Sequence, residues 1–459
     1  MNTPPNTASG KTVIRRAAIV TMDDRLGELE MGDILVEGDR IVEIAPDIEM
    51  ADAVEIDARG MIAIPGFVDS HRHCWEGLLR SALPDGTLTD YFETVNGRLG
   101  PAYTPDDVYA GTLISMLGAL NAGVTTVLDW AHVQSTSEHT DASIQALRDA
   151  GGRAVFAFGM PAAMDQGHKY PDDIHRLARD EFASKDQLLT LALATLSPEH
   201  SPDETTRHCW NTAREAGARI TAHAGLWGFG TQNEIERFGR DGMLGPDVTL
   251  VHGGFLSPEE WRIIADTGTT VSIAAQIELL MGHGSAPIQA ALDVGVLPSI
   301  SVDVETSVPG DFFTHMRATL AEQRGEVFRR KHRGDAKTPE LIGVRDVMKM
   351  ATVAGAEANG LSSKVGSLSV GEQADIVLLR ADSVNVLPVN DLVGAVVSGM
   401  DVTNVDTVMV AGRVVKRSGQ LVGYDLASIY EKAYAARDRV FAKAGVPCAC
   451  SRHLVATRP

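Results

Sequence analysis

The chain of 459 residues is long enough for one large α/β domain and a smaller satellite domain. A hydrophobic content of 44% and a charged content of 22% are ordinary for a globular protein, and they exclude a disordered or fibrous class. The formal net charge of -20 disfavours nucleic acid and membrane partners, because so acidic a surface repels phosphates and anionic lipid headgroups.

The N-terminal segment and the cysteines bear on the cell compartment. Residues Met1 to Lys11 are polar and lack the apolar run of a secretory signal. No stretch approaches the roughly 20 apolar residues that a membrane span needs. The chain has four cysteines, and the C-x-C pair near its end has neither zinc-ribbon nor thioredoxin spacing. We therefore expect a cytoplasmic protein with reduced cysteines.

Short β-branched and aliphatic runs separated by turn residues occupy the first 64 residues and predict strands. These strands are too few and too short to fold alone, so they need partners from elsewhere in the chain. Similar runs occur at Ala374–Leu379, Val405–Val410 and Arg413–Lys416. We predict a small composite β-sandwich domain, built from residues 1–64 and 365–425.

Strand-length apolar runs alternate with helical stretches over residues 65–364. This alternation predicts an α/β fold with a parallel sheet, most simply a closed (β/α)8 TIM-like barrel. A doubly wound sheet is the alternative, which is disfavoured because no G-x-G-x-x-G follows an early strand. Residues 426–459 predict a C-terminal helix and tail. The expected barrel strands include Thr125–Leu128, Ala154–Phe158, Leu188–Ala194, Arg219–His223, Val248–His252, Thr270–Ile273 and Pro298–Val302.

Residues of metal-binding type end four of these strands, where barrel enzymes carry their sites. His71 and His73 follow the first apolar run, and residues i and i+2 of an extended chain point to the same side. His223, His252 and Asp303 end three later strands. A single histidine at a strand end is more often a plain polar residue than a ligand. The coincidence over four strands nevertheless predicts a metal site.

The run PGFVDSHRH, the later His223, His252 and Asp303, and the closing GSLSVGEQADIVLL together resemble the amidohydrolase superfamily over essentially the whole chain. The chain looks most similar to the branch of aminohydrolases and triazine hydrolases, which includes cytosine deaminase-like enzymes. This resemblance implies that His71, His73, His223 and Asp303 bind the metal, and that His252 touches the metal or hydrogen-bonds the attacking water. It also implies a small-molecule substrate and a homodimer or higher homo-oligomer.

The resemblance also bears on the number of ions. Two-metal members bridge their ions with a modified lysine on strand four, but the run LLTLALATLSPEH contains no lysine, and Lys185 precedes it. We therefore predict one divalent ion, zinc, with iron or manganese as alternatives. Such an ion would lower the pKa of its water toward ~7. Asp303 would then accept the proton of the attacking water, and His252 would orient that water or polarise the electrophile.

One position departs from the family. Aminohydrolases of this branch usually carry a glutamate three residues after the strand-five histidine, which protonates the ring of the substrate, and this chain has Leu226 there. Glu278, Glu305 and His200 are candidate replacements, although a solvated or salt-bridged loop position is the favoured interpretation for the two glutamates. Further candidate contacts to substrate are His283, Trp75, Glu76 and Trp227, with Trp130 and His132 as weaker ones. For the tryptophans the alternative is core packing.

Three functions fit these residues. The leading one is a metal-dependent hydrolase acting on a non-peptide C–N bond of a cyclic or aromatic amine or amide. Without the glutamate, the site also suits a cyclase that forms a heterocycle by dehydration in secondary metabolism. The third is a non-catalytic binding barrel, against which the retention of all four ligand residues argues.

Overall fold

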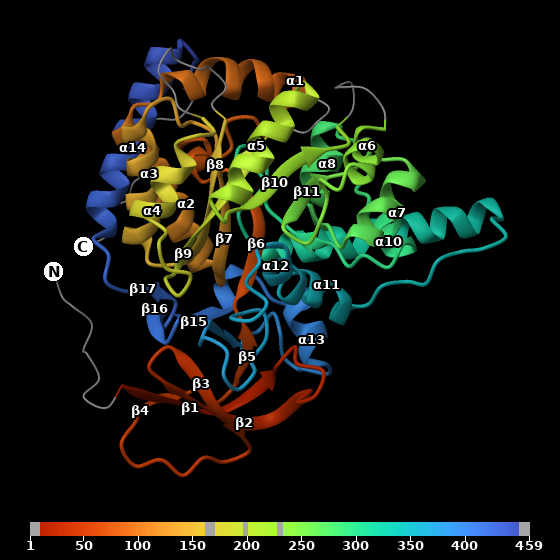
Figure 1. Ribbon diagram of the computed structural model, residues 1–459. Coiled ribbons are helices and arrows are strands. Elements are labelled where there is room, and N and C mark those ends of the chain that lie inside the picture. The colour runs from red at the N-terminus through yellow and green to blue at the C-terminus, as the bar shows by residue number, and fades with distance from the viewer. Residues whose placement is uncertain (1–9, 161–169, 196–200, 227–232, 449–459) are drawn as a thin grey trace.

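The computed structural model describes residues 10–160, 170–195, 201–226 and 233–448, and it is built around a barrel of parallel strands (Figure 1). Eight strands follow one another around this barrel in chain order. Several of them are buried along their whole length, because helices cover the outer face and side chains fill the inner one. The strands are β6 (Phe67–Arg72), β7 (Val124–Ala131), β8 (Arg153–Gly159), β9 (Leu189–Thr195), β10 (Arg219–Ala224), β11 (Val248–His252), β12 (Thr270–Ile273) and β13 (Ser299–Ile300).

Polar contacts close the barrel between its last strand and its first. The Ser70 hydroxyl lies 2.7 Å from the hydroxyls of both Ser272 and Ser299. Beyond β13, the amide of Asp303 donates to the carbonyl of His71 at 2.9 Å, and the amide of His73 donates to the carbonyl of Asp303 at 2.9 Å. The ends of the first and last strands are thereby held side by side.

Helices pack around the outside of the barrel (Figure 1). Sequence signals start and stop several of them: Ser257 and Glu260 form a capping box, and Gly151 and Gly268 end helices in the left-handed region. The helices that follow or support the strands are α1 (Leu88–Tyr91), α2 (Pro105–Asn121), α3 (Ser137–Ala150), α4 (Ile174–Asp180), α5 (Asp203–Glu215), α6 (Glu234–Arg240), α7 (Pro258–Thr267), α8 (Ala275–Met281), α9 (Ile288–Asp293), α10 (Phe312–Arg333), α11 (Val344–Met350), α12 (Val353–Ala358), α13 (Leu392–Gly394) and α14 (Leu426–Ala444).

A second sheet combines strands from both chain ends, which lie together below the barrel in Figure 1. Its order is β17-β16-β15-β14-β5-β1-β2-β3, with β4 beside β1. The two halves join where β14 runs antiparallel to β5, with Val377 opposite Ile64. The strands are β1 (Lys11–Val20), β2 (Glu28–Glu37), β3 (Arg40–Ala45), β4 (Val54–Asp57), β5 (Met61–Pro65), β14 (Ile376–Arg380), β15 (Val405–Val410), β16 (Arg413–Arg417) and β17 (Gln420–Leu421).

The predicted fold class, a TIM-like barrel with a small β domain from both chain ends, is confirmed. A buried ion pair ties the two parts together, because Arg153 at the start of β8 donates to Asp375 just before β14. The domain bounds given above stay predictions. Within the described ranges, none of the helices is long and apolar enough to cross a membrane.

Candidate metal centre

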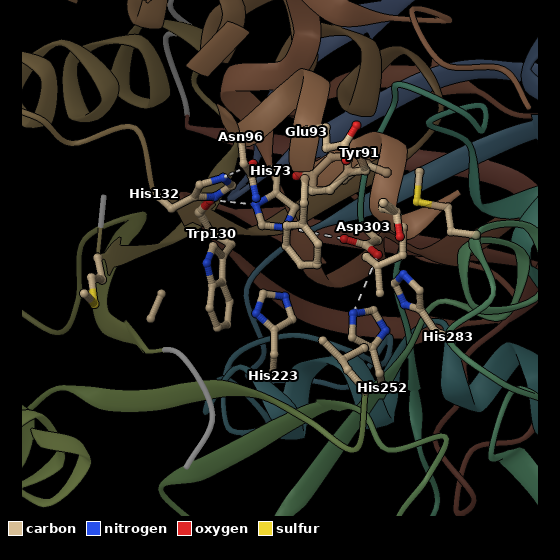
Figure 2. Close-up of a pocket in the computed structure, with 18 of the residues that line it drawn as sticks. His73, Tyr91, Glu93, Asn96, Trp130, His132, His223, His252, His283 and Asp303 are labelled. Atoms are coloured by element: carbon tan, nitrogen blue, oxygen red, sulfur yellow. Dashed lines mark hydrogen bonds and ion pairs between the residues drawn. The ribbon is translucent and has the colours of Figure 1, made fainter. Parts of the chain in front are cut away.

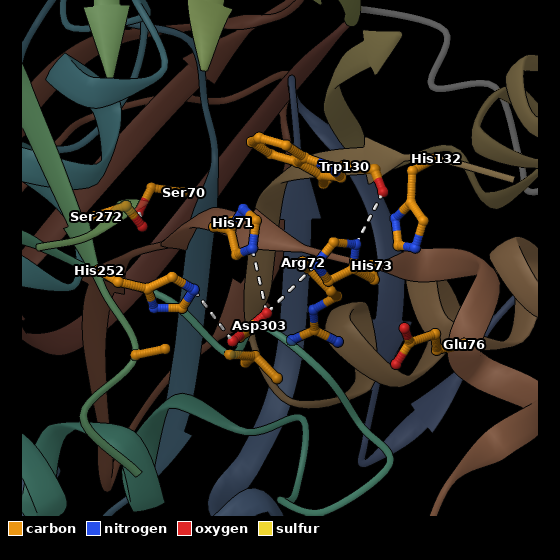
Figure 3. Close-up of polar contacts among 12 residues, drawn as sticks. Ser70, His71, Arg72, His73, Glu76, Trp130, His132, His252, Ser272 and Asp303 are labelled. Atoms are coloured by element: carbon orange, nitrogen blue, oxygen red, sulfur yellow. Dashed lines mark hydrogen bonds and ion pairs between the residues drawn. The ribbon is translucent and has the colours of Figure 1, made fainter. Parts of the chain in front are cut away.

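Four histidines and one aspartate converge at the C-terminal end of the barrel: Figure 3 shows His71, His73, His252 and Asp303, and Figure 2 shows His223 beside them. The Nε2 atom of His71 lies 3.2 Å from Oδ1 of Asp303, and that of His73 lies 3.4 Å from the same oxygen. The rings of His223 and His71 are 5.0 Å apart, centroid to centroid. The Nε2 atom of His252 lies 3.8 Å from the other carboxylate oxygen, Oδ2. The structure therefore brings together every residue of the expected ligand set.

The hydrogen bonding of His73 tests whether this cluster suits a cation. Its Nδ1 atom lies 3.1 Å from the backbone carbonyl of Trp130, and a carbonyl oxygen can only accept. A proton therefore sits on Nδ1, and in the neutral imidazole the lone pair of Nε2 faces the Asp303 carboxylate. Two acceptors that face each other inside the protein repel, and a cation between them removes the repulsion. Imidazole with carboxylate is a donor set that zinc, iron and manganese accept, so these residues fit a divalent ion.

Two residues of the cluster have an unusual backbone. His252 has φ 76° and Asp303 has φ 65°, the left-handed region that residues with a Cβ seldom adopt. Such a conformation costs of order 1–3 kcal/mol and persists only where the surroundings hold it. For Asp303 those surroundings include its two backbone hydrogen bonds to β6 and its end. At each of the two positions, the side chain lies at the mouth of the barrel.

A buried ionic network lies behind the ligands. Arg72, between His71 and His73 in the chain, donates to Asp69 at 2.8 Å, and Asp69 also accepts the amides of His71 and Val302. Because alternate residues of a strand point to opposite sides, Arg72 faces away from the histidine imidazoles. The network thus ties β6, and His73 directly after it, to the segment that carries Asp303.

Glu305 belongs to this network and does not line the cavity. Its carboxylate accepts from Arg80 Nε at 3.0 Å and from the hydroxyl of Ser115, and Arg72 Nη1 lies 3.7 Å away. Burial alone would raise the pKa of Glu305, but the two arginines hold it below its usual value. This arrangement corresponds to the salt-bridged alternative of the sequence interpretation.

Glu278 also lies outside the cavity lining, on α8. Its Oε1 atom is 3.2 Å from Nδ1 of His252 and accepts the amide of Ala274 at 3.0 Å. The side chain is fully buried, and burial raises its pKa. Glu278 thus reaches the candidate metal centre through His252.

Glu76 and Trp75 lie in the short 3₁₀ helix Cys74–Leu79 that follows His73. Oε1 of Glu76 accepts from the Tyr91 hydroxyl at 2.6 Å, whereas Oε2 has no partner among the residues that the structure describes. Burial raises the pKa of Glu76 to about 8. The Trp75 ring packs edge-on against Tyr103 and His132, as a core side chain does.

A cavity of about 480 Å³ opens over the cluster (Figure 2). Side chains of Trp130, Leu226 and Met281 contribute to a mostly apolar wall. His283 also borders the cavity, 4.7 Å from the His252 ring and edge-on to it, and burial lowers its pKa to about 3. His200 and Trp227 fall outside the described residues. The remaining lining comprises His73, Leu88, Thr89, Tyr91, Phe92, Glu93, Asn96, His132, Met160, Ala194, Thr195, His223, His252, Asp303 and Val304.

The sequence interpretation missed one group of lining residues. Tyr91, Glu93 and Asn96 come from α1 and the π-helical segment Phe92–Leu99 between β6 and α2. Oδ1 of Asn96 lies 3.2 Å from Nε2 of His132, which places both at one end of the cavity. The only signal for these residues in the sequence is their place after the first barrel strand, because the segments that follow barrel strands form the mouth of the barrel.

Comparisons with known proteins agree with this geometry. The chain is 26% identical to a 5'-deoxyadenosine deaminase of Methanosarcina mazei over 449 residues, which cover 94% of this chain and 98% of the relative. It is 27% identical to a 5-methylthioadenosine/S-adenosylhomocysteine deaminase of Moorella thermoacetica over 438 residues, 92% of this chain and 97% of the relative.

Solved structures give the same result. An adenosine deaminase from Xanthomonas campestris with bound zinc superposes with a TM-score of 0.82 at 20% identity, over 94% of this chain and 98% of that one. The atrazine chlorohydrolase TrzN from Arthrobacter aurescens TC1, complexed with zinc, has a TM-score of 0.80 at 25% identity, over 93% of this chain and 100% of that one.

A family model matches residues 62–415, which span the barrel and both sheet halves at their junction. The resemblance stated from the motifs is thereby confirmed, and with it the expectation of an enzyme. The chain belongs to the amidohydrolase family.

Proposed function

We propose that this protein hydrolyses a non-peptide C–N bond of a small nitrogen heterocycle, with His71, His73, His223 and Asp303 holding one zinc ion. The observation that carries the proposal is the position of His73, whose Nδ1 donates to a backbone carbonyl and whose Nε2 lies 3.4 Å from the Asp303 carboxylate, so that a cation between them would be held by the neutral imidazole and the carboxylate. The similarity to zinc-bound deaminase and triazine hydrolase structures supports the choice of ion.

The two carboxylate oxygens of Asp303 have different surroundings. Oδ1 faces His71 and His73, whereas Oδ2 faces His252. When bound, the ion would supply hydroxide near neutral pH by lowering the pKa of a water molecule. Asp303 then accepts the proton of the attacking water and passes it to the leaving group, while His252 orients that water.

The cavity wall supports a flat, weakly polar substrate. Trp130 and Leu226 offer apolar surface beside the ligand histidines, and Asn96 and His132 offer hydrogen bonds at one end. Because Leu226 cannot protonate a ring nitrogen, the best substrates are rings that are already electron-poor, or that carry a good leaving group. His283, Glu76, His200, Trp75 and Trp227 remain proposed contacts, of which His283 borders the cavity.

The apolar side chain of Leu226 in the cavity also suits a second reaction, the dehydrative cyclisation of a linear amide, in which no ring nitrogen is protonated. The two candidates differ in their balance of water. Hydrolysis consumes one water molecule for each C–N bond broken, and cyclisation releases one water molecule for each ring formed.

The test combines metal analysis with a substrate panel. We expect about one zinc ion per chain and turnover of at least one member of a panel of 5'-deoxyadenosine, 5'-methylthioadenosine and aminotriazines. Released ammonia and product mass are measured, with Asp303→Asn as the inactive control. Well under one ion per chain would contradict the proposal. A parallel incubation with linear amides that gives a product lighter by one water, while no member of the panel is turned over, would favour the cyclase.

A further inference from the structure

Glu278, a buried acid in the first turn of α8, contacts His252 on the side of the ring that faces away from Asp303. Glu278 lies four residues after Ala274, where β12 has just ended, and its Oε1 atom accepts the amide of Ala274. The same oxygen lies 3.2 Å from Nδ1 of His252. The carboxyl therefore bridges the end of β12 and the histidine at the end of β11.

The direction of the bond between Glu278 and His252 follows from the first of these contacts. When the carboxyl is ionised, both of its oxygens only accept; when it is neutral, the carbonyl oxygen is the stronger acceptor and takes the backbone N–H. In the neutral form the proton would reside on Oε2, which has no partner within the described part of the chain. Oε1 thus accepts from His252 as well, and the histidine proton sits on Nδ1.

We propose that Glu278 is a positioning residue, which fixes His252 in the Nδ1–H tautomer and directs its Nε2 lone pair toward Asp303. The Nε2 atom faces Oδ2 of Asp303 at 3.8 Å, on the side of the metal centre. With a proton on Nδ1 alone, Nε2 acts there as an acceptor, able to take a hydrogen bond from the attacking water or to touch the ion. Its catalytic consequence rests on the proposed function, whereas the tautomer itself does not.

A second contact from the same segment limits the freedom of the His252 ring. The turn that ends α8 carries His283, whose amide donates to the carbonyl of Glu278 at 2.9 Å. The His283 ring lies edge-on to the His252 ring at 4.7 Å, and both border the cavity in Figure 2. Glu278 contacts the His252 ring at Nδ1, and His283 packs against that ring. One short segment thus sets the proton and the orientation of His252.

The tautomer is tested directly on the zinc-loaded protein, without substrate, by nitrogen NMR of histidine-labelled samples. The signals of His252 are identified by their loss in His252→Asn. We expect a proton bound to Nδ1 in the wild type and in Glu278→Gln, which keeps an acceptor oxygen, and its loss in Glu278→Met. Glu305→Gln is the matched control, a buried glutamate at the same barrel end that does not contact His252, and it should leave the signal unchanged. A wild-type His252 protonated on Nε2 would overturn the proposal.

The catalytic consequence is tested by a double-mutant cycle on a substrate that the enzyme turns over. Loss of a residue that orients an active-site histidine costs about 10–100-fold. We expect Glu278→Met to lower kcat by that factor with little change in KM, Glu278→Gln to restore most of it, and Glu278→Met to have no further effect in a His252→Asn background. Additive losses in the cycle would show that Glu278 does not act through His252. Absence of turnover in every variant and the wild type would count against the proposed function and leave the NMR result standing.

Discussion

Arg72 and Asp69 form an ion pair at 2.8 Å in which both side chains are fully buried, directly behind the two ligand histidines. Removing one partner of such a pair strands the other charge in the protein interior, which costs about 3–5 kcal/mol. Arg72 also faces Glu305, so its loss leaves a second carboxylate short of a cation.

Arg72→Met should therefore lower the free energy of unfolding by about 3–5 kcal/mol, as measured by urea denaturation. We also expect weaker metal binding, because Asp69 holds the amides of His71 and Val302. Arg80→Met is the control: Arg80 pairs with the same Glu305, but its side chain is 39% exposed, so its loss should cost much less. Equal losses in the two variants would argue against a special role for the buried pair.

Loss of a ligand should release the ion. His223→Ala and Asp303→Asn should each reduce bound zinc to well below one ion per chain, measured by elemental analysis after gel filtration. Because an ion that binds only the folded state stabilises it, both variants should also lose the rise in Tm that added zinc produces in the wild type. His139→Gln is a suitable control, since His139 is buried but hydrogen-bonded to the Tyr103 carbonyl and Thr136. Full zinc occupancy in His223→Ala would remove that residue from the ligand set.

An acid at position 226, where this chain has leucine in place of the usual glutamate, should widen the substrate range. Leu226 lines the cavity and is buried, so a glutamate there would be partly desolvated and would hold a proton near neutral pH. Leu226→Glu should raise kcat/KM by about 10-fold or more for aminoheterocycles with a basic ring nitrogen. An optimally placed general acid contributes at least about 100-fold, and an introduced glutamate should reach only part of that. Leu226→Gln, of the same size but without the acid, should not. A gain that is equal in both variants would point to polarity rather than proton donation.

Lys416 gives a pH dependence of stability away from the active site. It is buried, its Nζ donates to the carbonyl of Asn121 at 2.7 Å, and burial lowers its pKa from 10.5 to about 8. Between these values the unfolded chain binds more protons than the folded one, so this group makes stability rise with pH. Its charged form therefore costs roughly 3 kcal/mol below pH 8.

The unfolding free energy of Lys416→Met minus that of the wild type should be largest below pH 8. It should shrink by roughly 3 kcal/mol as the pH approaches 10.5. Urea denaturation of both proteins at pH 7, 8, 9 and 10 gives the difference between their unfolding free energies. The titration of all other groups is common to both proteins and cancels in this difference. A difference that does not change with pH would contradict the shift.

The barrel and its ligand set follow from local sequence features, because a strand end fixes where a side chain points. The partners of the two glutamates do not. In the sequence, Glu278 and Glu305 are both glutamates shortly after an expected strand. In the structure, Glu305 forms ion pairs with Arg80 and Arg72, which lie more than 200 positions earlier. Such pairings depend on how the barrel closes.

Strand lengths show a related limit. The apolar run Pro298–Val302 predicts a full strand, but only Ser299 and Ile300 pair with β12, and the backbone then turns to the left-handed conformation at Asp303. Conversely, β6 extends through His71 to Arg72, although its apolar run stops at Val68. One strand is thus shorter and the other longer than its apolar run, and in both the difference lies at the end next to the residues of the cluster.

The pairing of β5 with β14 has a consequence for how the chain is made. About 310 residues separate Pro65 from its partner Ile376, so during translation the apolar edge of β5 waits tens of seconds at about 5–20 residues per second. An unpaired strand edge of this kind is a template for association with other chains. Yield in recombinant expression should therefore depend on chaperones that shield the N-terminal strands, and chains that stop before β14 should be found in aggregates.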